Sequence, residues 1–154
     1  MKRHPPPMPG QPAHRYLCRV YYEDTDAAGT VYHANYLRLA ERARTEALRE
    51  LDIPHAEMTR LFGLIFMVRR AKLDYLAPAR LDDSLVVGTR ALAIGAASIV
   101  LLQWFHRADQ PGRTLAVAEI QLACVRISDM RPARIPPRWR DTLATLAGGN
   151  GPQT

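Results

Sequence analysis

The stretch YEDTDAAGTVYHANY, residues 22–36, separates two segments with different hydrophobic periods. Residues 16–22, which lead into it, are rich in aromatic and branched side chains, as is typical of a β-strand. Beyond it, apolar side chains recur at spacings of three and four as far as residue 51. This pattern predicts an amphipathic helix over 35–51 with Asn35 as its N-cap. The chain is therefore expected to pass from a strand, through a polar turn, directly into one long helix.

The rest of the chain is dominated by strand-like segments. Apolar runs bounded by Pro, Gly and Asp residues predict four more strands, at 64–76, 84–94, 97–107 and 114–127. Short helices are expected from Pro54 through Leu61 and from Pro136 to Leu146. One long helix and five mostly antiparallel strands predict an α+β fold in which a curved sheet wraps the helix. A single helix leaves the sheet edges uncovered, so a homo-oligomer is expected.

The length of 154 residues predicts a single domain. Residues 1–14 form a proline-rich arm without a packing pattern and are expected to be disordered. The folded domain is expected over 15–141, followed by the end of the last helix and a flexible tail over 142–154. The two cysteines, Cys18 and Cys124, lack the spacing of a metal or redox motif and are expected to be buried free thiols.

The formal net charge of +6 is spread along the chain rather than concentrated on one element. Residues 1–14 and 129–141 each carry a net +2, which leaves +2 for the interleaved charges of 15–128. Binding to nucleic acid is therefore not expected. The longest uncharged stretch, 91–105, is shorter than the roughly 18 residues of a spanning helix, and prolines follow the basic N-terminus where a signal peptide is apolar. We expect no membrane span and a cytoplasmic location.

The turn before the long helix brings two aspartates to a helix entrance. Backbone N–H groups at the start of a helix are unpaired and lie at the positive end of its dipole, where they polarise a carbonyl oxygen placed beside them. A carboxylate delivered by the preceding turn could attack that carbonyl or activate a water. Asp24 and Asp26 also resemble the start of a calcium loop, but Ala28 and Asn35 stand where that loop needs ligands. No metal or cofactor is therefore expected.

The run 22–36, together with ERART at 41–45 and YLAPARLDD at 75–83, resembles the signature of the hotdog-fold 4-hydroxybenzoyl-CoA thioesterase family. Within this family the chain is most similar to the YbgC-type, Tol-Pal system-associated acyl-CoA thioesterases, over residues 16–140. The resemblance implies a hotdog fold. It also implies hydrolysis of an acyl-CoA or acyl carrier protein thioester by a homodimer or homotetramer, without a cofactor.

The resemblance further implies roles for individual residues. Asp26 matches the catalytic carboxylate, acting as nucleophile or as general base on water, and His33 matches the position whose backbone N–H polarises the thioester carbonyl. The turn over 95–98, which is basic in several relatives that bind CoA phosphates, is uncharged here, so other basic residues are expected to bind them. The implied substrate-binding residues are Gly29, Val31 and Tyr32 in the loop, Phe66, Met67 and Val68 in the acyl pocket of a partner subunit, and Arg69, Arg70, Lys72, Arg131 and Arg134 for the phosphates.

Glu41 lies on the long helix, where some hotdog enzymes carry a catalytic carboxylate; with Arg42 and Arg44 beside it, we expect an ion pair instead. A second function stays open from the sequence: a non-catalytic or weakly catalytic module that docks acyl carrier protein or phospholipid-synthesis enzymes. A hotdog dehydratase is not favoured, because such enzymes carry a different pairing of His and acid on the central helix. The intact pair of Asp26 and His33 favours hydrolysis.

Overall fold

The computed structural model describes residues 10–147 and contains five strands and three α-helices in that range. In chain order the elements are β1 (His14–Arg19), the short 3₁₀ turn η1 (Tyr22–Asp24), α1 (Asn35–Glu50), α2 (His55–Phe62), β2 (Leu64–Tyr75), β3 (Ser84–Ile94), β4 (Ser98–Arg107), β5 (Thr114–Arg126), α3 (Pro137–Ala144) and the 3₁₀ turn η2 (Thr145–Ala147). The expected long helix, the two short helices and the five strands are all confirmed.

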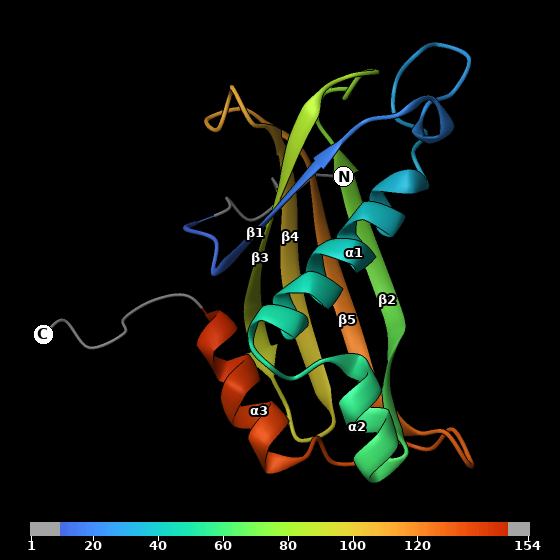
Figure 1. Cartoon of the computed structure of the whole chain (residues 1–154), viewed down its shortest axis with the longest axis vertical. Coiled ribbons are helices and arrows are strands. Elements are labelled where there is room, and N and C mark those ends of the chain that lie inside the picture. The colour runs from blue at the N-terminus through green and yellow to red at the C-terminus, as the bar shows by residue number, and fades with distance from the viewer. Residues whose placement is uncertain (1–9, 148–154) are drawn as a thin grey trace, which may run out of the picture.

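The five strands form one antiparallel sheet in the order β1-β3-β4-β5-β2. The sheet curves around α1, which crosses its concave face (Figure 1). The loop between β1 and α1 lies at one end of this helix, whereas α2 and α3 lie at the other end. β2 and β1 are the two edge strands, and β2 is the longer, with 12 residues.

Small side chains allow α1 to lie close to the sheet. Ala40, Ala43 and Ala47 are all fully buried on the helix face that contacts the strands. Beneath them Gln103 of β4, also fully buried, donates from Nε2 to the carbonyl oxygen of Ala40 at 2.8 Å. The same amide nitrogen donates to the Thr89 hydroxyl of β3 at 3.0 Å, so one side chain joins the helix to two strands.

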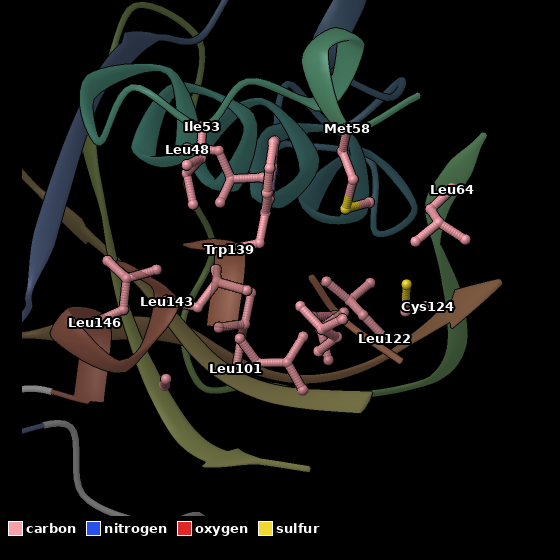
Figure 2. Packing of buried hydrophobic residues seen from close by; sticks show 14 of the residues in the cluster. Leu48, Ile53, Met58, Leu64, Leu101, Leu122, Cys124, Trp139, Leu143 and Leu146 are labelled. Carbon is pink, nitrogen blue, oxygen red and sulfur yellow. The ribbon is translucent and has the colours of Figure 1, made fainter. Parts of the chain in front are cut away.

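The core has a larger part under α2 and α3 and a smaller part under the first half of α1. In the larger part Trp139 of α3 packs among side chains from α1, α2 and the strands (Figure 2). Its ring meets Phe62 edge-on, with centroids 5.6 Å apart. The terminal helix α3 therefore covers one end of the core. The loop between β1 and α1, which carries Asp26, lies at the opposite end of the domain.

Two local expectations need correction. Asn35 is the first residue of α1 and not its N-cap; Ala34 takes that position without a side-chain bond. The Asn35 amide instead donates to the Asp24 carbonyl at 2.9 Å, so it ties the helix to the preceding loop. The first strand spans His14–Arg19 rather than 16–22, and Tyr22 lies in η1, because Asp24 accepts the Tyr21 N–H and closes a tight turn.

Residues 1–9 and 148–154, which carry most of the expected arm and tail, lie outside the described residues. Just inside that boundary the Ala13 N–H donates to the Thr89 carbonyl at 3.0 Å, and β1 begins at His14.

Both cysteines are free thiols; Cys124 is buried and Cys18 is partly buried. Within residues 10–147, no helix is long and apolar enough to cross a membrane.

Candidate active site

The Asp26 side chain is held in place by its own loop. Its Oδ1 accepts the Ala28 N–H at 2.9 Å, and the Thr30 hydroxyl lies 3.3 Å from Oδ1 and 3.4 Å from Oδ2. Gly29 completes the turn at φ +75°, in the left-handed region that favours glycine. No basic side chain within residues 10–147 lies within 4 Å of the carboxylate. The carboxylate is therefore oriented by neutral donors while it stays exposed to solvent.

Backbone bonds fix this loop to the strand connection over 76–83. The Val31 N–H donates to the Ala79 carbonyl at 2.9 Å, and the Leu81 N–H donates to the Gly29 carbonyl at 3.2 Å. Val31 is buried, so it anchors the loop to the core. Gly29 and Val31 thus shape the loop, and the substrate-binding role that the family resemblance implies for them stays a prediction.

His33 lies at the entrance of α1, immediately before Ala34 and Asn35. In the described part of the chain its backbone N–H donates to no acceptor. Its carbonyl oxygen accepts the Tyr75 hydroxyl, from the end of β2, at 2.8 Å. The ring of Tyr32, which is about half exposed, lies 4.4 Å from the His33 ring.

Asp26 and His33 line one open hollow of about 370 Å³. Its lining residues are Asp26, Thr30, Val31, His33, Tyr36, Tyr75, Leu76, Ala77 and Pro78. The hollow thus combines an oriented carboxylate and an unpaired N–H donor with apolar walls. Sequence reasoning missed the contributions of Tyr36 and Tyr75, although Tyr75 begins one of the segments that carry the family resemblance. Burial raises the pKa of both phenols; the Tyr75 hydroxyl donates to the His33 carbonyl, whereas the Tyr36 oxygen accepts the Ala79 N–H at 3.4 Å.

The expected acyl-pocket residues lie elsewhere in the same chain. Phe66 and Val68 line a second hollow, of about 270 Å³, between α1, α2 and β2. Met67, between them, faces the other side of the sheet, because successive strand side chains alternate. A bulge between Val68 and Arg70 shifts the register, and Arg69, Arg70 and Lys72 are exposed. Within one chain, none of these residues lines the Asp26 hollow.

The expected phosphate-binding arginines separate in space. Arg134 lines a hollow of about 530 Å³ at the turn between β3 and β4, but Arg131 does not line it. Sequence reasoning missed Arg140 of α3, which lines the same hollow and donates from Nε to the Gly95 carbonyl at 3.4 Å. Two arginines from other segments therefore reach the uncharged turn over 95–98.

The expected ion pair of Glu41 is wrong. Glu41 accepts the Thr45 hydroxyl at 2.8 Å, and neither Arg42 nor Arg44 comes within 4 Å of a carboxylate in the described chain. Thr45, one helical turn from Glu41, binds the carboxylate in place of an arginine.

Among residues 10–147, no group of three or more His, Cys, Asp or Glu side chains could hold a metal ion.

Comparison with known proteins identifies the family. The model of the thioesterase-like superfamily matches residues 20–143, which is most of the chain. The chain belongs to the thioesterase-like superfamily. Its α+β architecture is accordingly the hotdog fold, and it is a thioester hydrolase.

Relatives of this thioesterase include YbgC-type enzymes. The acyl-CoA thioesterase YbgC of Haemophilus influenzae is 42% identical over 118 residues, covering 77% of this chain and 85% of that protein. The acyl-CoA thioester hydrolase YbgC of Escherichia coli O6:H1 is 41% identical over 124 residues, covering 79% and 89%. The crystal structure of a probable thioesterase from Bartonella henselae is 30% identical with a TM-score of 0.73, covering 80% of this chain and 98% of that one. The expected resemblance to the YbgC-type thioesterases is confirmed.

Proposed function

We propose that this thioesterase hydrolyses acyl-CoA thioesters with Asp26 and His33 as its catalytic groups. The observation that carries the proposal is the hollow that Asp26 and His33 both line, with the Asp26 carboxylate oriented by its loop and the His33 N–H making no hydrogen bond within residues 10–147. In this assignment the His33 N–H binds the thioester carbonyl oxygen. Asp26 attacks the carbonyl carbon or removes a proton from a water that attacks it.

A thioester suits this small set of groups. In the hydrolytic step the oxygen of water bonds to the carbonyl carbon, the carbon–sulfur bond breaks, and the products are a carboxylic acid and a thiol. A thiol has a pKa of about 8.5, so it leaves readily without a dedicated general acid. One carboxylate and one polarising donor are therefore sufficient, and no triad of Ser, His and Asp is required.

One observation favours CoA as the carrier. Acyl-CoA is the substrate class named for the YbgC relatives from Haemophilus influenzae and Escherichia coli. Within one chain, the hollow that Arg134 and Arg140 line lies at the α3 end of the domain, away from Asp26, so it does not supply the phosphate site for a thioester bound at His33 of the same chain.

We further propose that two copies pair along β2. This strand bonds only to β5, so its other edge is free over 12 residues, and Met67 and Val68 on it are exposed. Pairing would bring Phe66, Met67 and Val68 of a second copy to the site, as the family resemblance implies. The expected cytoplasmic location suits the two free cysteines, which call for a reducing compartment.

The experiment replaces Asp26 with Asn and measures hydrolysis of acyl-CoA thioesters of several chain lengths. Asn keeps the size and much of the loop's hydrogen bonding but removes the negative charge. We expect the rate to fall by about 10²–10⁴-fold while the circular dichroism spectrum stays unchanged. Asp24→Asn is the matched control, because Asp24 caps the Tyr21 N–H in the same loop and lines no part of the hollow. Near wild-type turnover by Asp26→Asn would overturn the role assigned to Asp26, whereas absence of turnover by the wild type on every acyl-CoA tested would favour the docking-module function.

A further inference from the structure

One stripe of α1 leads away from the candidate site. His33, Leu37, Glu41 and Arg44 follow one another at spacings of four, four and three, so they share one side of the helix. Glu41 lines a shallow surface hollow with Leu37 and also lines the hollow that contains Arg44. The stripe therefore runs from the reacting end at His33 to a deeper hollow against β2.

Arg44 at the end of this stripe is a partly buried cation without a carboxylate partner. Its side chain makes one hydrogen bond, from Nη1 to Gln103 Oε1 at 3.5 Å, and no carboxylate of residues 10–147 lies within 4 Å of it. Burial is the main cause that lowers the pKa of Arg44, and the negative charge of Glu41 opposes the shift. None of its nitrogens is sealed in the protein without a partner. Arg44 lines the hollow, and its other N–H donors are not enclosed by the protein.

The hollow around Arg44 combines polar and apolar walls. Phe66, Val68 and Leu122 supply the apolar surface, and His55 meets Phe66 edge-on with ring centroids 6.4 Å apart. Glu41, an exposed residue, also lines this hollow; one of its carboxylate oxygens accepts the Thr45 hydroxyl, and the other makes no hydrogen bond within residues 10–147. A guanidinium donor and a carboxylate acceptor thus face one space of about 270 Å³.

A hydroxyl is the group that matches both partners. Its oxygen accepts from the guanidinium of Arg44, and its hydrogen donates to the free oxygen of Glu41. A methyl end would leave the Arg44 donors without water or partner, and a carboxylate end would be repelled by Glu41. We propose that Arg44 and Glu41 bind a hydroxyl at the far end of the acyl group and so make this enzyme selective for hydroxylated acyl chains.

The spacing along the helix sets the length of such a chain. Arg44 lies eleven residues beyond His33, about 16 Å at the helical rise of 1.5 Å per residue. Helical side chains lean toward the N-terminus, which shortens the span to the guanidinium. A short acyl group held at His33 does not reach Arg44, whereas an extended chain of medium length does. The inference rests on the proposed function, because it places the thioester carbonyl at His33.

The test compares ω-hydroxydecanoyl-CoA with decanoyl-CoA, which differ only in the terminal hydroxyl. We expect the wild-type kcat/KM to favour the hydroxylated substrate at least tenfold. Arg44→Met and Glu41→Gln should each remove most of that preference, mainly through KM, while hydrolysis of decanoyl-CoA persists. Arg49→Met is the matched control, because Arg49 lies on the same helix, pairs with Glu46 at 3.4 Å and lines neither hollow.

A binding measurement separates this inference from the proposed mechanism. Calorimetric titration of both acyl-CoA thioesters into Asp26→Asn reports the hydroxyl preference without requiring turnover. Equal affinity for the two ligands, or an unchanged preference in a folded Glu41→Gln variant, would overturn the selectivity even if Asp26 proves catalytic. A clear preference with no hydrolysis by the wild type would instead sustain the selectivity and count against the mechanism. Should Arg44→Met fold poorly, Arg44→Lys, which keeps the charge and a donor, should retain part of the preference.

Discussion

The phenol of Tyr75 donates to the carbonyl oxygen of His33 at 2.8 Å. This bond joins the end of β2 to the entrance of α1 through two residues that lie 42 positions apart in the chain. The carbonyl and the N–H of a residue flank the same Cα, so the bond restricts how the unpaired His33 N–H can turn. Tyr75 also packs edge-on against Tyr36, with centroids 5.4 Å apart, and Tyr36 lies buried on the core side of α1.

Replacement of Tyr75 with Phe should slow hydrolysis without unfolding the protein. The change removes the hydroxyl and keeps the ring that packs on Tyr36. A hydrogen bond of this kind contributes about 0.5–1.5 kcal/mol, so we expect kcat to fall between about twofold and tenfold with little change in KM. Steady-state kinetics on one acyl-CoA thioester would measure it. Tyr32→Phe is the matched control, because the Tyr32 hydroxyl makes no hydrogen bond within residues 10–147; an equal loss in both variants would contradict the role of the bond.

Replacement of Gly29 with Ala should destabilise the Asp26 loop. Nothing lies within 4 Å of the added Cβ, so the cost arises from the positive φ of +75° and not from crowding. That conformation costs an alanine about 1–2 kcal/mol. Urea unfolding should show a loss of this size together with reduced hydrolysis, since Gly29 also donates to the Asp26 carbonyl. Gly112→Ala, with equal space and no positive φ, should leave both quantities unchanged.

Stability should fall on mild acidification because of His55. Burial is the main cause that lowers its pKa below the usual 6.5; Glu41 opposes the shift, and Arg44 and Arg49 add to it. As the pH drops below about 6.5, the unfolded chain binds a proton at His55 that the folded chain does not, so the free energy of unfolding decreases. Urea unfolding between pH 7.5 and 5.5 should show a smaller decrease for His55→Gln than for the wild type. Identical pH dependence of the two proteins would exclude His55 as a source.

Local patterns in the sequence predict most of the fold. The apolar period of α1 and the turn residues between the strands locate each element to within a few residues, because these signals act over short distances. The same is true of Gly29 and Val31, whose roles in the loop follow from the turn itself.

Contacts between distant segments are not visible in the sequence. Arg140 meets Gly95 across 45 residues, and Tyr75 meets His33 across 42. Two local errors have a different cause, namely competition between partners. The Asn35 side chain binds the Asp24 carbonyl instead of capping its own helix, and Thr45 takes the Glu41 carboxylate that two arginines were expected to pair with.

The buried amide of Gln103 has a consequence for how this enzyme could change. It holds the Ala40 carbonyl, in the middle of α1, and the Thr89 hydroxyl of β3 at once. A slip of the helix by one residue along the sheet would leave that amide buried without its partners, which is costly. This link therefore fixes the position of α1 along β3 and β4. Under the proposed path of the acyl chain along α1, the carbonyl end at His33 and the far end at Arg44 both keep their positions relative to these strands.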